Sequence, residues 1–295
     1  MTIKNIEEFI DVTTLDPVDR IQILLSSMSK KQAKAASYIM NAKEIVPYQT
    51  LAELSASCGV SEASIVRLAG TLGYDGYSHL QRELRNSLKK ELSISKRLEL
   101  TEQLGTDSDS IMEEVFQKGI EGLRRTIGAI RQDFFKKAVD LLSGAKRVFM
   151  FGSRSSLYLV EFFALELRWI RNDVYALSTQ SSAFDAMSDL REGDVFFAIS
   201  MPHYLRSTVR AVQLANQKGI PTIAITDSLS SPLIPYTAVP LVVDNEIYSY
   251  CDNALPVLAV ITALLNAVGH ATRPKSNEIL KKNEESWKHF DLYLG

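Results

Sequence analysis

The chain has 295 residues, which is long enough for two domains that each bury a core of their own. Its 46% hydrophobic and 23% charged residues exclude a long disordered tail, and its net charge of −2 excludes a uniformly basic coat for nucleic acid. Positive charge is concentrated in residues 28–92, which carry nine basic and six acidic side chains, whereas residues 1–27 sum to −3.

The cysteines and the apolar runs limit the compartment and the chemistry. Cys58 and Cys251 are far apart in apolar surroundings, which argues against a disulfide framework and against a zinc site. The first residues lack the basic and then apolar layout of a signal peptide. The longest apolar run, residues 254–265, is too short to cross a bilayer and predicts a buried helix. We therefore expect a soluble, cytoplasmic protein that needs no metal and no other cofactor.

Residues 1–92 are predicted to form an all-α domain. Its first helix has apolar residues at three- and four-residue steps, as a core-facing helix requires: Val18, Ile21, Leu24, Leu25 and Met28. A second helix is predicted over residues 30–42, and a last one from about residue 77 to residue 92. The region contains no convincing strand pattern.

Two short helices with clear start and stop signals lie between them. Thr50 and Glu53 form a capping box at the start of the first, and Gly59 suits the left-handed conformation that ends it. Ser61 is a good N-cap for the second helix, which is predicted to end near Gly73. Two short helices joined by a glycine turn have the geometry of a helix-turn-helix motif.

The second helix of such a motif reads base edges in the major groove with its N-terminal part. Its outward stripe is predicted to lie opposite Ile65 and Ala69, and Arg67 on this stripe suits a guanine. The residues predicted to contact duplex DNA are Ser61, Glu62, Ser64, Arg67 and Thr71, with Lys30, Lys31 and Lys89 on phosphates. The alternative is that this polar stripe is only the solvated face of a helix in a bundle that does not bind DNA.

Residues 51–77 resemble the DNA-binding domain of RpiR-type regulators. Gly59-Val60-Ser61, Arg67 and the run from Leu72 to Tyr77 hold the positions of the family pattern, and the likeness spans roughly residues 18–92. It implies that the partner is double-stranded operator DNA. One departure is Gly70, which stands where the family has bulkier or basic residues and costs a helix about 1 kcal/mol relative to alanine.

A polar segment, residues 93–110, is predicted to be a partly helical linker, and residues 111–295 are predicted to form an α/β domain. Continuous apolar runs there read as buried strands: 147–151, 194–200, 221–226 and 238–243. Helix-length stretches lie between them at 155–171, 205–218 and 253–269. Unbroken apolar strands that alternate with helices predict a doubly wound parallel sheet covered on both faces.

Ligands of open parallel sheets bind at the carboxyl ends of the strands, beside helix N-termini that favour anions. The residues predicted to bind an effector there are Ser153, Arg154, Ser155, Ser156, Ser200, His203, Tyr204, Arg206 and Thr226. Other roles stay open: the hydroxyls can cap helices, Gly152 can serve a tight turn, and His203 can be an ordinary loop residue. The two arginines can equally pair with carboxylates such as Glu161 or Asp227.

Residues 111–270 resemble the SIS (sugar isomerase) domain that RpiR-type regulators carry. The matching segments are 151–156, 194–200, 215–220, 223–227 and 231–233. Most SIS domains have a second glycine where Arg154 stands and a Ser-Gly-x-Thr loop where this chain has Met201-Pro202-His203. The chain therefore looks like a subgroup with GSRSS and SxPxY loops. The resemblance implies a sugar-derived effector (a sugar phosphate, sugar acid or polyol) and a homodimer or higher oligomer formed through this domain.

These features together predict a regulator of carbohydrate-related metabolism whose DNA binding responds to an effector, with no catalytic residues. Two alternatives remain. The first is an aldose–ketose isomerase with an accessory helical domain, which would need a base such as Glu161, Glu166, Glu246 or His270. The second is a module whose helical domain binds protein instead of DNA.

Overall fold

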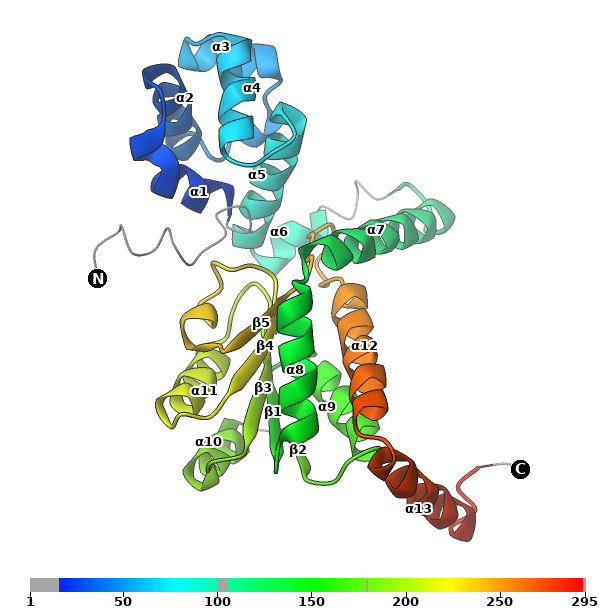
Figure 1. Cartoon of the computed structure of the whole chain (residues 1–295). Coiled ribbons are helices and arrows are strands. Elements are labelled where there is room, and N and C mark those ends of the chain that lie inside the picture. Colours follow the sequence, from blue (N-terminus) through cyan, green and yellow to red (C-terminus); the bar gives the residue numbers. More distant parts are fainter. Residues whose placement is uncertain (1–15, 100–104, 179, 294–295) are drawn as a thin grey trace. The chain divides into compact units, whose positions relative to one another are not determined.

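The computed structural model describes residues 16–99, 105–178 and 180–293 (Figure 1). The chain divides into two compact units. The first contains the described residues up to Glu114 together with Glu246–Asp252, and the second contains Val115–Asn245 and the residues from Asn253 onward. Residues 1–15 of the predicted helical domain and 100–104 of the predicted linker lie outside the described residues.

The first unit is helical, as the sequence predicts. Its helices are α1 (Pro17–Leu24), α2 (Lys30–Asn41), α3 (Leu51–Cys58), α4 (Glu62–Thr71), α5 (Tyr77–Glu91) and α6 (Ile94–Glu99), with 3-10 turns at Leu25–Ser27 and Val46–Tyr48. The capping box of Thr50 and Glu53 is confirmed, and a second one, formed by Ser29 and Gln32, starts α2. Gly59 ends α3 with a φ of 62°.

The core of the first unit fixes α4 in place. Ile65 and Leu68 of α4 are fully buried in it, in one cluster with Ile39 of α2 and Leu54 of α3. Arg20 is also buried: its Nη1 donates to the Leu72 carbonyl at 2.7 Å, and its guanidinium lies 4.3 Å from the Tyr74 ring centroid. One cation thus satisfies the last turn of α4 and closes the core around it.

The second unit is an α/β domain with five parallel strands in the order β2-β1-β3-β4-β5. The strands are β1 (Val148–Gly152), β2 (Val174–Leu177), β3 (Val195–Ile199), β4 (Thr222–Thr226) and β5 (Val239–Val242). The helices are α7 (Ser108–Ala129), which begins in the first unit, α8 (Gln132–Gly144), α9 (Ser155–Arg168), α10 (Gln180–Asp189), α11 (Arg206–Gln217), α12 (Leu255–Ala271) and α13 (Lys275–His289). A 3-10 turn lies at Ile234–Tyr236.

Helices cover both faces of this sheet, so the predicted doubly wound fold is confirmed (Figure 1). α8, α9 and α12 pack on one face, and α10 and α11 pack on the other. Neighbouring residues of β1 point to opposite faces: Met150 joins the first cluster, and Phe151 joins the second. Both faces of the strand are dry, which explains its unbroken apolar run.

β2 and α10 are missing from the elements that the sequence predicts. β2 has only four residues and lies at the edge of the sheet, where Tyr175 is 42% exposed. A short, half-exposed edge strand carries no continuous apolar run, so its pattern does not rise above that of a loop.

The long apolar run near the C-terminus forms α12, which contributes Val257, Ile261, Leu264 and Val268 to the core. Among the described residues, no single helix is long and apolar enough to cross a membrane. One pair, α12 with α13, passes that test only when the two helices are joined across a bend of 108°.

Candidate functional site

The first candidate surface is the exposed side of α4. The helix packs against α2, α3 and α5, and the turn before it is fixed by two hydrogen bonds. Ser55 Oγ donates to the Val60 carbonyl at 2.6 Å, and Lys34 Nζ donates to the Gly59 carbonyl at 3.3 Å. The two helices and the turn therefore form the predicted helix-turn-helix, with α4 in the position of the second helix.

The prediction that Ser64 lies on the outward stripe is wrong. Its side chain is only 1% exposed, because it shares the inward side of α4 with Ile65 and Leu68. The Ser64 hydroxyl lies 2.9 Å from that of Ser61 and accepts a hydrogen bond from Arg67 Nη2 at 3.3 Å. Ser64 therefore acts on the surface only through its neighbours, by orienting Ser61 and Arg67.

The exposed side of α4 consists of six residues, one of which is a large apolar residue that the sequence analysis does not identify. Val66 is 42% exposed beside Arg67. The complete set is Glu62, Ala63, Val66, Arg67, Gly70 and Thr71. The sequence does contain this signal, since Val66 lies four residues after Glu62 and two residues before the buried Leu68, which places it about 160° from Leu68 around the helix.

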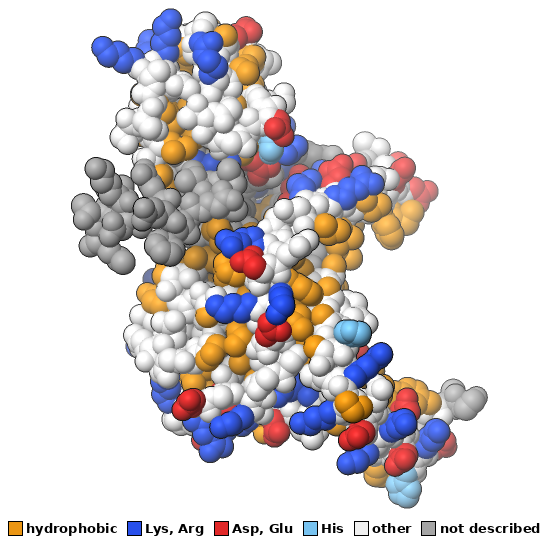
Figure 2. Space-filling view, in the orientation of Figure 1, with side chains coloured by type: hydrophobic (Ala, Val, Ile, Leu, Met, Phe, Trp, Pro, Cys, Tyr) orange, Lys and Arg blue, Asp and Glu red, His pale blue; other side chains and the backbone are white. Residues whose placement is uncertain are grey.

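The other residues predicted to contact DNA are placed unequally. Lys30 and Lys31 are exposed in the first turn of α2, next to Gln32. Gln32 Nε2 donates to the Thr71 hydroxyl at 2.8 Å, so this turn adjoins the end of α4. Lys89 is near the end of α5, about 18 Å from the start of that helix at a rise of about 1.5 Å per residue. In Figure 2, Lys and Arg side chains gather at the top of the first unit, at the end where α2 and α3 lie in Figure 1.

Thr71 is exposed, but its hydroxyl is already engaged. It donates to the Arg67 carbonyl at 2.9 Å and accepts from Gln32. Ser61 and Glu62 are exposed at the start of the helix, and no side chain caps the amides there. The part of α4 from its start to Arg67 thus offers free amide donors and one guanidinium, and the N-terminal part of this helix enters a groove in this motif.

The second candidate site is the edge of the sheet at the carboxyl ends of β1, β3 and β4. Ligands of doubly wound sheets bind in the crevice at this edge, so the region bounded by the three loops is called the crevice below. These strands are neighbours in the sheet, so the three loops that follow them converge at one edge. The order β2-β1-β3 means that the chain leaves β1 in one direction and β3 in the other, and ligands of doubly wound sheets bind at such a switch point.

Two helices start at this edge without a side-chain cap. The N-caps of α9 and α11 are Arg154 and Leu205, and neither accepts a hydrogen bond from its helix through its side chain. The alternative that serine hydroxyls cap these helices is therefore not what the structure shows. Ser153 Oγ lies 3.4 Å from Thr208 Oγ1 and joins the two loops. The open first turns leave backbone amides to bind an anion.

The backbone of both loops is strained. Arg154 has φ 56° and ψ −127°, and His203 has φ 66°. Such conformations cost a residue with a side chain about 1–3 kcal/mol and cluster at ligand clamps. At Gly152 a side chain would meet the Ser156 carbonyl oxygen at 2.7 Å, so this glycine does serve a close backbone approach.

The charged side chains of the crevice are available for a ligand. Arg154 and Arg206 are exposed, and in the described part of the chain neither forms an ion pair. The alternative pairing with Glu161 or Asp227 is thus absent; Asp227 instead accepts a hydrogen bond from the Tyr204 hydroxyl at 2.5 Å. Two free guanidinium groups beside two helix N-termini make this edge attractive to anions.

The hydroxyls of the crevice differ in availability. Ser155 is exposed, whereas Ser156 is 7% and Ser200 5% exposed. Thr226 is fully buried, and its hydroxyl donates to Ser231 Oγ at 2.8 Å. Burial, with the nearby charge of Asp227, raises the pKa of Tyr204 far above its ordinary value, so this hydroxyl stays a donor. Thr226 and Tyr204 therefore shape the wall of the crevice while their own protons are engaged.

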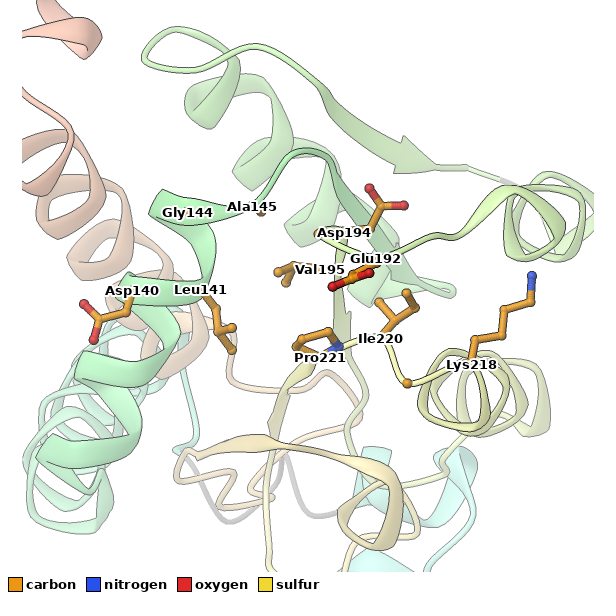
Figure 3. A pocket seen from close by; sticks show the side chains of 12 residues that line it. Asp140, Leu141, Gly144, Ala145, Glu192, Asp194, Val195, Lys218, Ile220 and Pro221 are labelled. Atoms are coloured by element: carbon orange, nitrogen blue, oxygen red, sulfur yellow. The ribbon is translucent and has the colours of Figure 1, made fainter.

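Two hollows elsewhere contain none of the predicted effector residues. One of about 500 Å³ lies at the amino ends of the strands, where Asp140, Glu192 and Asp194 line it (Figure 3). Its one basic lining residue, Lys218, donates to backbone carbonyls, so this acidic wall does not suit an anion. The other hollow, of about 390 Å³, lies among α9, α12 and α13. In the described ranges no cluster of histidine, cysteine and carboxylate side chains could hold a metal ion.

Comparison with known proteins assigns both units. Residues 17–93 match the family described as "Helix-turn-helix domain, rpiR family", and residues 141–267 match the SIS domain. An uncharacterized HTH-type transcriptional regulator from Haemophilus influenzae is 27% identical over 78% of this chain and 80% of that protein. The transcriptional regulator HexR from Escherichia coli is 24% identical over 95% of this chain and 98% of that protein.

Solved structures share the fold. NanR from Vibrio vulnificus, solved in complex with ManNAc-6P, has a TM-score of 0.58 and 21% identity, covering 95% of this chain and 100% of that one. The sugar isomerase domain of an RpiR transcription factor from Sphaerobacter thermophilus has a TM-score of 0.58 and 24% identity, covering 59% of this chain and 98% of that one. The chain belongs to the RpiR-type transcriptional regulators, with an rpiR-family helix-turn-helix domain followed by a SIS domain.

Proposed function

We propose that this regulator binds duplex DNA through the part of α4 from its start to Arg67 and that an anionic, sugar-derived effector in the sheet crevice controls this binding. The observation that carries the proposal is the exposed side of α4. It presents Arg67 little more than one turn after an uncapped helix start, and Lys30 and Lys31 are exposed in the turn of α2 that adjoins the other end of α4. A guanidinium so placed suits a guanine, and the lysines suit phosphates.

The effector is proposed to be a sugar phosphate or sugar acid. Support comes from the free guanidinium groups of Arg154 and Arg206 and from the open N-termini of α9 and α11. The structural relative NanR was solved with the sugar phosphate ManNAc-6P. A polyol has no charge for the two arginines, so the geometry favours an anion over it.

A homodimer that acts in the cytoplasm completes the proposal. One helix-turn-helix reads a half-site, and a two-fold dimer presents two α4 helices to half-sites about 34–36 Å apart. Effector binding would then change the balance between arrangements that fit and do not fit the operator.

An isomerase role is not part of the proposal, because aldose–ketose isomerisation needs a base near the reacting carbon. Glu166 and His270 line the hollow among α9, α12 and α13. Glu166 lies 11 residues after Ser155, or about 16 Å along the helix from the crevice. Glu161 is exposed on the same helix, and Glu246 belongs with the first unit.

The decisive test is a comparison of Arg67→Ala with Arg82→Ala on a duplex selected from a random-sequence library. Arg82 is a matched control, since it is exposed on α5 of the same unit and pairs with Glu83. We expect Arg67→Ala to lose about 1–3 kcal/mol, or roughly 5- to 150-fold in affinity, at fixed salt. Arg82→Ala should bind like the parent chain.

Equal binding by both variants would exclude α4 as the reading helix. If the affinity of the parent chain for DNA depends on neither the salt concentration nor the duplex sequence, the helical unit binds protein instead of DNA.

A further inference from the structure

One face of α7 is fixed to its own chain by small residues. Gly119, Gly122 and Thr126 are buried. A side chain at Gly122 would meet Asn253 Nδ2 and Asp244 Oδ2 at 3.2 Å, so the segment after β5 lies directly against the helix. The Asp244 amide also donates to Thr126 Oγ1 at 2.9 Å. This face is therefore occupied by the helix's own chain.

A second face of α7 is apolar and exposed. Its members, with their exposed fractions, are Met112 (58%), Phe116 (67%), Ile120 (42%) and Ile127 (80%), and the half-buried Leu123 lies among them. From Phe116 onward the steps of four, three and four residues are those of a helix–helix seam. At about 100° per residue this stripe lies roughly a quarter turn from the buried face, so a partner can reach it. Figure 2 shows hydrophobic side chains gathered along the projecting part of α7.

Charges beside this stripe favour one kind of partner. Glu113 and Arg124 are both exposed, and in the described part of the chain neither forms an ion pair. They are 11 residues apart, so they lie on the same flank of the helix but about 16 Å from each other, too far to pair within one copy. In two antiparallel α7 helices related by a two-fold axis, Glu113 of each copy lies beside Arg124 of the other.

We propose that the α7 stripe is the contact through which a second copy of this chain binds, with the two helices antiparallel. The stripe is self-complementary in charge, as a two-fold contact requires, and a parallel pair would instead place acidic ends together. The inference deepens the proposed function, since it rests on a dimer and assigns the surface that forms it.

The first test is sedimentation velocity of the full chain without DNA. We expect the parent chain to be a dimer and Phe116→Glu/Ile127→Glu to dissociate, with a dimer Kd raised at least about tenfold. Both residues are exposed, so circular dichroism should show an unchanged fold. Tyr158→Glu is the control, because this residue is 71% exposed on α9 and outside the stripe; it should remain a dimer.

The second test exchanges the charges. Glu113→Arg and Arg124→Glu should each weaken the dimer, and the double variant should restore it. Since the two positions are too far apart to meet within one copy, only pairing between copies explains such a rescue. A double variant as weak as the single ones would overturn the antiparallel contact.

A monomeric parent chain, or dissociation by Tyr158→Glu and not by the α7 variants, would overturn the assignment of the surface. No DNA is present in these sedimentation runs, so such a result would not bear on the proposal that α4 reads DNA. Conversely, a parent chain that is a dimer through α7 but selects no duplex would count against DNA reading by α4 alone.

Discussion

The exposed side of α4 and the crevice at the edge of the sheet differ in which groups they offer to a ligand: α4 offers side chains, and the crevice offers mainly backbone amides. The surface of α4 consists of side chains that remain outside after Ile65 and Leu68 have packed inward. The crevice is largely backbone: the ends of parallel strands and the open first turns of α9 and α11. A single substitution can therefore remove a contact of α4 completely, whereas the crevice retains its amides and loses only charge or strain.

The largest effect in the crevice is expected from Arg206→Ala. This variant removes a free guanidinium at the start of α11, and charge-assisted contacts contribute about 1.5–3 kcal/mol, so the affinity for an anionic effector should fall at least about tenfold. The measurement is a thermal-shift titration with sugar phosphates, sugar acids and polyols. Arg210→Ala, one turn further along the same exposed side, is the control and should titrate like the parent chain. Equal shifts for both variants would place the effector elsewhere.

Arg154→Gly should raise the free energy of unfolding and lower the affinity for the effector. Relief of the positive φ gains about 1–3 kcal/mol, and the greater freedom of glycine in the unfolded chain costs about 0.5–1 kcal/mol, which leaves a net gain of about 1 kcal/mol. Chemical denaturation measures this gain. Arg154→Ala removes the same charge without relieving the backbone, so it should lose effector affinity without any gain. A stabilised alanine variant would contradict the strain at this position.

The smallest effect is expected from Val66→Ala on α4. An exposed apolar side chain beside Arg67 suits a thymine methyl group in the major groove, a contact of about 1 kcal/mol or less. The test compares the selected duplex with versions in which single thymines are replaced by deoxyuridine. One such replacement should weaken the parent chain and leave Val66→Ala unaffected. If every replacement affects both proteins equally, Val66 does not read a methyl group.

The two regions also differ in how far the sequence predicts them. The crevice follows from topology, because parallel strands that end at one edge must bring their loops together whatever the side chains do. The sequence therefore predicts these residues as a set, together with the elements that carry them: residues 153–156, Ser200, His203, Tyr204, Arg206 and Thr226. The sequence does not show which hydroxyls are already bonded, as Thr226 is to Ser231, because that depends on the loop after β4.

The face of α4 depends on helix phase, which is harder to read. Ser64 appears polar and exposed by type, yet tertiary packing turns it inward, and Val66 appears apolar and buried by type, yet it is exposed. At both positions the residue type suggests the wrong burial. The correct burial follows only from the position of each residue around the helix relative to the buried Leu68 and Leu72. Arg67 satisfies both criteria, which is why it was predicted correctly as an exposed residue.

Hydrogen–deuterium exchange of the full chain tests the account most directly, because it reports each ligand at its own surface. The chain is measured alone, with the selected duplex, and with the sugar phosphate that gives the largest thermal shift. We expect DNA to slow exchange at the start of α4, around residues 61–67, and the sugar phosphate to slow exchange at the first turns of α9 and α11. Slowed exchange by DNA confined to the second unit, with α4 unchanged, would contradict it.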